Sequence, residues 1–363
     1  AVGLCILLNV FGYKYFMHTL SADRDNWEGE YYLYTNMQNK NRFLSRFGVY
    51  EYLYKDVSIV VKSQNHTELS DAEKEEVEAF IENHYHPEKN DMSSIFEGKN
   101  LIMVLGEAFD TAAINEELTP TLYKLSEEGY YFTNYYAPIY LSATGDSEFI
   151  SQTGMLPSVD YGTTSYTFFN NSYPYSLANL LNKKDYKANS FHAYIAEFYN
   201  RELFHDSLGF ITFYDMDKLN IHFWYEYEFG INWLYDKDMF YSMIEHTNLS
   251  APFYNFGISV SGHLPYVSFR TELKENLKKI EESSYSGLLE ESKCYLAAQM
   301  NFDQGIEELL KCLEEKGELD NTVLVIYGDH YPYGIKEQAT LDEIVGYSDY
   351  QKYHVPFIIY DCS

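Results

Sequence analysis

Short apolar runs alternate with amphipathic stretches in the chain from residue 100 onward. The runs NLIMVLGE (100–107), APFYNFGISVSGH (251–263) and TVLVIYGDH (322–330) each end in a glycine followed by polar residues. Continuous apolar runs of this length are typical of strands that are buried on both faces of a parallel sheet. Because helical patterns lie between them, the sequence predicts an α/β fold with a mainly parallel central sheet flanked by helices.

Capping residues indicate where the helices begin and end. In the stretch 119–129, Thr119 is the expected N-cap, Pro120 the first helical residue and Gly129 the stop. Another helix is predicted in 70–86, with Ser70 as its N-cap. Two further segments, 173–193 and 295–330, each indicate a helix, a turn and a strand, and the turn of the second contains a glycine.

The two ends of the chain differ from this core. Residues 1–12 are almost wholly apolar but too few to span a bilayer, and we interpret them as the end of a transmembrane helix. The tail of a signal sequence and a buried helix are the alternatives. Residues 20–68 are polar and aromatic, as in a connecting arm, and the final apolar run 355–360 is a predicted strand at which a domain rarely ends. We expect a membrane-proximal arm over 1–95 and a larger domain over 96–363 that is incomplete at its C-terminus.

Composition and charge restrict the classes of function. The 363 residues are 46% hydrophobic and 22% charged, which is typical of a globular chain. The net charge of −29 argues against a nucleic-acid-binding protein, which needs basic surface. An anionic substrate would require local positive charge, for example from a metal ion. The 38 tyrosines would suit a surface that faces sugars or a membrane, or reflect only the composition of the source organism.

The cysteines and a histidine pair indicate no additional site. Cys5, Cys294, Cys312 and Cys362 are far apart and form no CxxC motif, so neither a cysteine zinc site nor a disulfide framework is predicted. We expect Cys294 and Cys312 to be small apolar residues of one helical region. The HYH sequence at 84–86 is interpreted as the solvated end of a surface helix.

Reactive polar residues follow four of the predicted strands. They are Glu107, His192, His263 and the pair Asp329–His330. Because the carboxyl ends of parallel strands meet at one edge of a sheet, we expect these residues to share a site. Glu107, Asp329 and His330 offer two carboxylates and an imidazole, a mixture that Mn²⁺, Mg²⁺ and Zn²⁺ all accept.

The segment YLSATGDSEF (140–149) crowds hydroxyl and acidic side chains together. In isolation it is compatible with a solvated turn. A metal site would need a fourth ligand, and Thr144 offers one. Because a divalent cation makes a hydroxyl more acidic, a threonine in that position would also be a nucleophile. Neither the G-x-S-x-G elbow of serine hydrolases nor a phosphate-binding P-loop occurs in the chain.

Six segments in the same order resemble the lipoteichoic acid synthase family, the metal-dependent phosphoglycerol transferases of the alkaline phosphatase and sulfatase superfamily. They are NLIMVLGEAFD, TPTLYKLSEEGYYFTNYYAP, ATGDSEF, SFHAYIAEFYNRELF, SVSGHLPY and NTVLVIYGDHY. The resemblance covers residues 95–360 and, more weakly, 41–56. It implies an alkaline phosphatase/sulfatase-like catalytic domain over 96–363.

The resemblance implies a role for each residue of the expected metal site. Glu107, Asp329 and His330 would bind one divalent ion, with Mn²⁺ favoured and Mg²⁺ or Zn²⁺ as alternatives. Thr144 would be both the fourth ligand and the catalytic nucleophile.

The substrate side of the site is likewise implied by the resemblance. His192, Arg201 and His263 would bind the phosphoglycerol group, and His263 would also take part in catalysis. Tyr199 stands where the family usually has the tryptophan of a WNR motif, so the stacking surface differs and the head group or acceptor stays open.

The reaction that the resemblance implies is an extracellular transfer of phosphoglycerol. An anionic phospholipid such as phosphatidylglycerol would be the donor, and a growing polymer or a glycolipid the acceptor, in the synthesis of lipoteichoic acid or a related glycerophosphate polymer. The family is anchored in the cell membrane by N-terminal helices that are absent from this chain, with the catalytic domain outside the cell.

Three other functions are alternatives. A true sulfatase needs Cys or Ser in a C/S-x-P-x-R motif, and ATGDSEF supplies threonine instead. A phosphoethanolamine transferase uses the same ligand set on a lipid or glycan, but such enzymes tend to be rich in disulfides. A non-catalytic glycolipid-binding domain is the third alternative, and the presence of all four metal and nucleophile positions argues against it.

Overall fold

The structure of the protein is a computed structural model. It describes residues 15–16, 18–20, 29–37, 40–64, 70–83, 88–138, 140, 142–158, 163–219, 225–226, 232–233, 235–346 and 349–363. The apolar run 1–12, with Cys5, and the HYH sequence at 84–86 lie outside the described residues.

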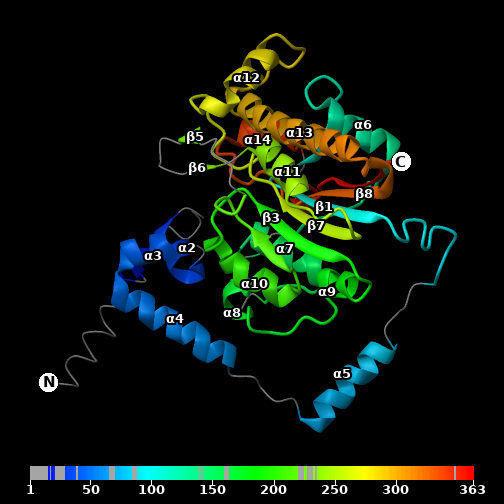
Figure 1. Cartoon of the computed structure of the whole chain (residues 1–363). Coiled ribbons are helices and arrows are strands. Elements are labelled where there is room, and N and C mark those ends of the chain that lie inside the picture. Colours follow the sequence, from blue (N-terminus) through cyan, green and yellow to red (C-terminus); the bar gives the residue numbers. More distant parts are fainter. Residues whose placement is uncertain are drawn as a thin grey trace.

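A seven-stranded sheet runs through the centre of the fold (Figure 1). Its strand order is β2-β9-β8-β1-β7-β3-β4, in which the run from β8 to β4 is parallel and β9 and β2 add antiparallel strands at one edge. The predicted fold class is therefore confirmed. The strands are β1 (Asn100–Gly106), β2 (Tyr130–Tyr131), β3 (Lys187–His192), β4 (Thr212–Tyr214), β7 (Phe253–Ile258), β8 (Thr322–Gly328) and β9 (Phe357–Asp361), and a separate pair joins β5 (Tyr225–Glu226) to β6 (Asn232–Trp233).

Successive residues of the central strands point into two different hydrophobic cores. In β1, Ile102 and Val104 belong to one core, and Met103 and Leu105 to the other. Burial on both faces explains why this strand is almost continuously apolar. One core is covered by α6 (Pro120–Glu128), α11 (Asp236–Glu245) and α13 (Glu290–Lys316), and the other by α7 (Thr144–Thr153), α9 (Leu177–Asn182) and α10 (Arg201–Leu208) (Figure 1).

The register of the sheet aligns the carboxyl ends of its central strands. Gly106 of β1 lies opposite Gly328 of β8, and Ile258 of β7 lies opposite His192 of β3. The residues that follow β1 and β8 therefore emerge side by side. Gly328 has to be glycine, because a Cβ there would lie 2.1 Å from the carbonyl oxygen of Phe109.

The predicted helices are present, and one of them begins at the residue that its capping sequence predicts. Helix α5 (Asp71–Asn83) begins as predicted: the Ser70 N–H donates to Glu73 Oε2 at 2.7 Å, and the Glu73 N–H donates to Ser70 Oγ at 3.3 Å. Cys294 and Cys312 are both buried on α13, as expected.

The ends of α6 depend on tertiary contacts instead. Thr119 stands at the N-cap position, but its hydroxyl donates to the carbonyl of Ala113 at 2.5 Å rather than capping the helix. Gly129 ends the helix in an extended conformation with φ −94°, not in the left-handed one of a glycine stop. A Cβ at Gly129 would lie 2.8 Å from the carbonyl oxygen of Ile359, so this glycine allows β9 to pass closely.

The segment expected to be a connecting arm is helical. It contains α2 (Glu30–Asn36), α3 (Lys40–Phe47) and α4 (Val49–Gln64), which surround a small core of their own with Leu33, Tyr34 and Phe43. Among the residues that the structure describes, no helix is both long and apolar enough to cross a membrane. The remaining helices are α8 (Thr164–Thr167), α12 (Lys274–Glu281), α14 (Gln338–Ile344) and the 3-10 turns η2 (Thr111–Ala113), η3 (Phe198–Asn200), η4 (Thr271–Leu273), η5 (Leu319–Asn321) and η6 (Asp349–Tyr353).

Candidate active site

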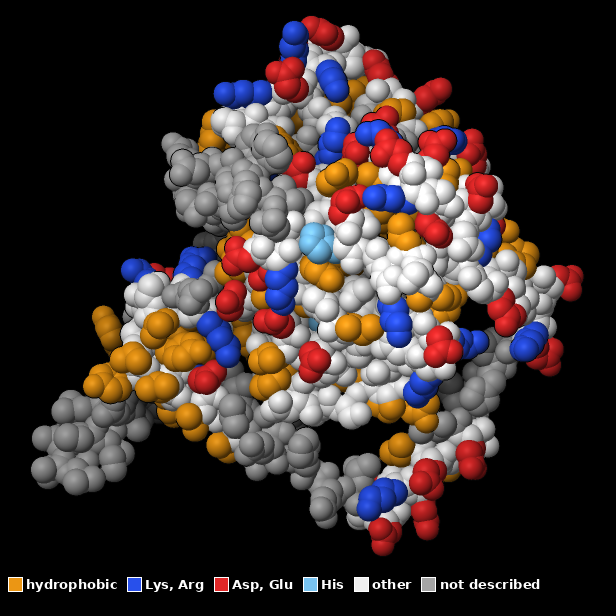
Figure 2. All heavy atoms as spheres, in the orientation of Figure 1, with side chains coloured by type: hydrophobic (Ala, Val, Ile, Leu, Met, Phe, Trp, Pro, Cys, Tyr) orange, Lys and Arg blue, Asp and Glu red, His pale blue; other side chains and the backbone are white. Residues whose placement is uncertain are grey.

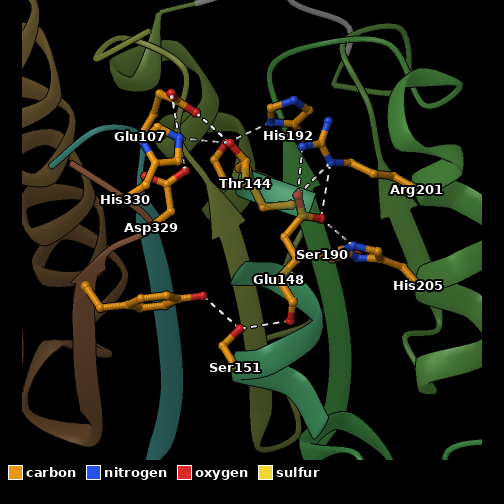
Figure 3. Close-up of polar contacts among 12 residues, drawn as sticks. Glu107, Thr144, Glu148, Ser151, Ser190, His192, Arg201, His205, Asp329 and His330 are labelled. Carbon is orange, nitrogen blue, oxygen red and sulfur yellow. Dashed lines mark hydrogen bonds and ion pairs between the residues drawn. The ribbon is translucent and has the colours of Figure 1, made fainter. Parts of the chain in front are cut away.

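Glu107, Asp329 and His330 form a buried cluster at the carboxyl edge of the sheet (Figure 3). Glu107 follows β1, and the other two residues follow β8. One potential ligand atom from each residue lies within 4.8 Å of the others. His330 Nε2 is 3.1 Å from Asp329 Oδ2 and 3.5 Å from Glu107 Oε1. Glu107 is more than 200 positions before Asp329 and His330 in the sequence. The structure brings these three residues together, as the strand-end pattern predicted.

The chemistry of this cluster is consistent with a metal site. His330 Nδ1 lies 2.9 Å from the carbonyl oxygen of Tyr331, which can only accept, so in the neutral ring the lone pair on Nε2 faces the two carboxylates. Asp329 Oδ2 is buried and accepts no hydrogen bond within the described part of the chain. Carboxylate oxygens and a nitrogen lone pair that face one another repel unless a cation lies between them. The residues present therefore fit a divalent cation.

The electrostatics of the two carboxyl groups lead to the same conclusion. Burial raises the pKa of Glu107 well above its usual value, the Asp329 charge raises it further, and the Thr144 hydroxyl opposes the rise. Burial also raises the pKa of Asp329, against the attraction of His330 and the hydrogen bond from Ala108. A bound cation would lower the pKa of both carboxyl groups, because it stabilises the ionised carboxylates and releases their protons.

Thr144 presents its hydroxyl to this cluster from the first position of α7. Its Oγ1 lies 3.2 Å from Glu107 Oε2 and 3.5 Å from His330 Nε2. The preceding residue, Ala143, has φ 39° and ψ −102°, a conformation that a residue with a Cβ rarely adopts. Such strain persists only where surrounding contacts enforce it, and it is often found at functional sites. Here it forms the sharp turn that positions the threonine at the cluster.

A second strained residue also contacts the cluster. Ala108, next to Glu107, has φ 48°. Its N–H donates to Asp329 Oδ1 at 2.8 Å, and its carbonyl accepts from Tyr295 Oη at 2.9 Å and from Gln299 Nε2 at 3.2 Å. Helix α13 thereby holds the loop after β1 in place. Tyr295 and Gln299 were not predicted as supporting residues.

His192 and Arg201 lie on the other side of Thr144 from the acidic cluster (Figure 3). His192 ends β3, and its Nδ1 lies 2.9 Å from the carbonyl oxygen of Ile258. Burial, and secondarily the Arg201 charge, lowers the pKa of His192 well below its usual value. The ring is therefore neutral near pH 7, with an unprotonated Nε2. Arg201 is the first residue of α10 and is 2% exposed.

The guanidinium of Arg201 is held by Glu148 of α7. Arg201 Nε lies 3.0 and 3.1 Å from the two carboxylate oxygens, and Nη2 lies 2.7 Å from Oε1. His205 Nε2 contacts the same carboxylate at 3.0 Å, and His205 Nδ1 is 2.8 Å from Ser190 Oγ (Figure 3). Nη1 of Arg201 is buried and has no hydrogen-bond partner among the described residues. It is the donor that remains for a ligand.

The role of Glu148 was not predicted from the sequence. Burial alone would raise the pKa of this carboxyl, but the charge of Arg201 and the hydrogen bond from His205 outweigh burial and lower it to about 2. A signal existed: Glu148 is four residues after Thr144, and His205 is four after Arg201, so each pair shares a helix face. What was missing was the knowledge that side chains of α7 and α10 meet, as Glu148 does with Arg201 and Phe149 with Phe204.

His263 is brought back toward the cluster by the loop after β7. Gly262 touches the backbone at Glu107, where a Cβ would lie 2.0 Å from the carbonyl oxygen, so only glycine permits this approach. His263 is half-buried, and its Nδ1 lies 2.7 Å from the carbonyl oxygen of Leu264. Burial lowers the pKa of His263, and the charges of Arg270, His330 and Arg201 are near enough to lower it further.

Tyr199 packs against Gly145, the residue after Thr144, and is buried, with φ 58°. A Cβ at Gly145 would lie 3.1 Å from its ring, and the Arg201 guanidinium carbon is 5.1 Å from the ring centroid. Much of the ring surface is thus taken up by the protein itself. Its expected use as a stacking surface for substrate stays a prediction.

Comparisons with known proteins agree with this geometry. A protein-family model described as Sulfatase matches residues 99–362. The chain is 28% identical over 332 residues to the lipoteichoic acid synthase-like YvgJ of Bacillus subtilis, covering 87% of this chain and 51% of that protein. It is 29% identical over 262 residues to the lipoteichoic acid synthase of Staphylococcus aureus, covering 68% and 38%. The chain spans about half the length of the curated relatives it matches, or less.

Solved structures give the same picture. The lipoteichoic acid synthase LtaP from Listeria monocytogenes superposes with a TM-score of 0.59 and 26% identity, covering 77% of this chain and 69% of LtaP. The Streptococcus pyogenes phosphoglycerol transferase GacH, solved with sn-glycerol-1-phosphate, has a TM-score of 0.51 at 17% identity, covering 85% and 76%, and shares the fold. A Vibrio parahaemolyticus protein of the alkaline phosphatase superfamily also shares it, with a TM-score of 0.50 at 20% identity over 72% and 60%. The fold is that of the alkaline phosphatase superfamily, and the chain is a distant homologue of lipoteichoic acid synthases.

Proposed function

The chain belongs to the sulfatase family, and from this premise we propose that it is a metal-dependent phosphoglycerol transferase with Thr144 as its nucleophile. The observation that carries the proposal is the position of the Thr144 hydroxyl, 3.2 Å from Glu107 Oε2 and 3.5 Å from His330 Nε2 at the start of α7. The similarity to proteins named lipoteichoic acid synthases supports phosphoglycerol as the transferred group.

Glu107, Asp329, His330 and Thr144 would hold one divalent cation. Mn²⁺ is the ion we favour, with Mg²⁺ or Zn²⁺ as alternatives that accept the same donors. When bound, the cation would lower the pKa of the threonine hydroxyl and offset the charge of the phosphodiester. This local positive charge is what allows a chain of net charge −29 to bind an anionic donor.

The transfer would proceed in two displacements at phosphorus. Thr144 Oγ1 gives up its proton and attacks the phosphodiester of a phosphatidylglycerol-type lipid, the bond from phosphorus to the diacylglycerol oxygen breaks, and that oxygen takes up a proton. Phosphoglycerol remains on Thr144. A hydroxyl of the growing polymer or a glycolipid then attacks the same phosphorus and gives up its proton, and Thr144 recovers its hydroxyl.

Three basic side chains would bind the phosphoglycerol group. Arg201 would donate from Nη1, since its other nitrogens are engaged by Glu148. The neutral His192 would contact a glycerol hydroxyl or phosphate oxygen through Nε2, and His263 would orient the leaving or the attacking oxygen. Tyr199 would line this side of the site beside Thr144.

We also propose a cellular arrangement. Residues 96–363 would form the catalytic domain outside the cell, and residues 1–95 the arm next to the membrane that contains the lipid donor. The apolar run 1–12 supports this arrangement, because it has the composition of the end of a membrane helix.

The test is to incubate the protein with phosphatidylglycerol labelled in its head group and with Mn²⁺, and to measure diacylglycerol release and the mass of the Thr144 peptide. We expect release and a phosphoglycerol adduct on Thr144. Thr144→Ala should lose both, whereas Thr153→Ala on the same helix should retain both, because that hydroxyl bonds only to backbone groups at the far end of α7, the Phe149 carbonyl and the Met155 N–H. Release from Thr144→Ala at the wild-type rate would refute the mechanism.

Two further substrates separate the alternatives. Release of diacylglycerol from phosphatidylethanolamine, but not from phosphatidylglycerol, would indicate a phosphoethanolamine transferase. Hydrolysis of an aryl sulfate alone would indicate a sulfatase. If neither lipid nor sulfate ester reacts and Mn²⁺ does not raise the melting temperature, the domain binds without catalysis.

A further inference from the structure

Helix α4 (Val49–Gln64) turns its apolar face away from the protein. Figure 2 shows hydrophobic side chains gathered over α3 and the beginning of α4. The spacing of the exposed apolar residues along α4 places them on one face of that helix. The exposed members on α4 are Val49 (51%), Tyr50 (87%), Leu53 (50%), Tyr54 (65%), Val57 (59%) and Val61 (51%).

The face of α4 that packs on the protein has Tyr52 on the small core, together with the charged side chains of the helix. Glu51 accepts a hydrogen bond from the Tyr34 hydroxyl at 2.5 Å, and Asp56 accepts from Lys40 at 3.2 Å. Lys55 lies over the Tyr34 ring, 4.2 Å from its centroid. A helix on the surface of a water-exposed domain normally turns its charged side chains outward, whereas here the exposed side chains in the described part of α4 are apolar or tyrosine. The outward face of α4 therefore has the composition of a surface that is covered by something apolar.

Charge distinguishes this part of the chain from the rest. Between Glu30 and Gln64 there are five basic and three acidic residues, whereas the whole chain has a net charge of −29. Both acidic residues of α4 are turned inward to Tyr34 and Lys40, and none of the six outward positions is charged. An anionic surface would be repelled by most of this protein but not by these helices.

We propose that α4 docks through this face on an anionic lipid bilayer, with its axis in the plane of the membrane surface. Aliphatic side chains would enter the boundary between head groups and acyl chains, and Tyr50 and Tyr54 would keep their hydroxyls at the polar level. Sixteen residues make a helix of about 24 Å, which is shorter than the hydrocarbon core, so the helix lies on the membrane rather than spanning it.

The first test measures binding of the full chain to vesicles of phosphatidylcholine and phosphatidylserine. Phosphatidylserine is anionic but is not the proposed donor, so the result does not depend on the proposed enzymatic function. The double variant Leu53→Glu/Val57→Glu should bind more weakly, on the order of tenfold, because two apolar contacts are replaced by charges facing an anionic surface. The control is Val77→Glu on α5, another exposed apolar residue, which should bind as the wild type does. Equal binding of the double variant and the wild type would overturn the proposal.

The second test locates the contact, because the apolar residues 1–12 are an independent candidate for membrane binding. Trypsin releases Phe47–Lys55 as one peptide that contains Tyr50, Leu53 and Tyr54. Hydroxyl-radical oxidation of this peptide, read by mass spectrometry, should fall several-fold when vesicles are added. Unchanged oxidation in vesicle-bound protein would show that another segment binds. Protection without vesicles that increases with protein concentration would show that a second copy covers the face. Either result would overturn the proposal.

Discussion

Replacing Glu148 by glutamine removes the charge that holds Arg201 while keeping the shape of the side chain. The carboxylate is buried and contacts Arg201 at 2.7 to 3.1 Å and His205 at 3.0 Å. Glutamine can replace only part of these contacts, because one of its ends is a donor that faces the donors of Arg201 or His205. The guanidinium of Arg201 would then be buried without its counter-charge.

The size of the effect follows from the pKa of Glu148. It is lowered from 4.5 to about 2 in the folded protein. At about 1.4 kcal/mol per pKa unit, this corresponds to about 3 kcal/mol of stability at neutral pH. The general cost of breaking a buried ion pair, roughly 3–5 kcal/mol, is of the same order. Because the folded pKa is the lower one, the contribution is complete above pH 4.5 and is lost as the pH falls toward 2.

The assay is urea denaturation of wild type and Glu148→Gln at pH 7 and pH 3. We expect Glu148→Gln to lower the free energy of unfolding by about 3 kcal/mol at pH 7 and by about half of that at pH 3. The matched control is Glu127→Gln, at an exposed glutamate of α6. It should change the free energy of unfolding little at either pH. A loss below about 1 kcal/mol at pH 7, or equal losses at the two pH values, would refute the reasoning.

Three other changes test other parts of the structure. Asp329→Asn should abolish the rise in melting temperature on adding Mn²⁺, which in the wild type corresponds to about 2.7 kcal/mol at a hundredfold excess over Kd; an equal rise in the variant would contradict the metal site. Gly262→Ala should cost more than about 2 kcal/mol in denaturation, because its Cβ would lie 2.0 Å from the Glu107 carbonyl oxygen, and an unchanged midpoint would contradict that contact. Asp303→Asn should gain stability relative to the wild type as the pH rises from 4 to 8. Burial raises the pKa of Asp303 from 3.8 to about 7, so the wild type loses stability over this range as ionisation favours the unfolded chain. A stability difference that does not change with pH would count against this account.

Much of the catalytic framework could be predicted from local sequence. The apolar runs that became β1 and β8 were recognisable because strands buried on both faces need nearly continuous hydrophobic residues. Parallel strands deliver the residues after their carboxyl ends to one edge, so Glu107, Asp329 and His330 could be grouped before any contact was known. The Ser70 cap was equally predictable, since it involves only neighbours along the chain.

Other features were decided by packing between distant segments. Glu148 is 53 residues from Arg201, and nothing near either residue in the sequence specifies that α7 and α10 lie together. Gly129 has the sequence pattern of a helix stop, but it is required because β9 passes close to it. The apolar face of α4 was not predicted, because residues 20–68 were interpreted as a connecting arm, and its outward direction depends on contacts of the other face with Tyr34 and Lys40. Sequence alone determines which faces and strand ends carry chemistry, because these follow from backbone periodicity. Only the tertiary structure decides which of them meet, because contacts between distant segments depend on the packing of the whole chain.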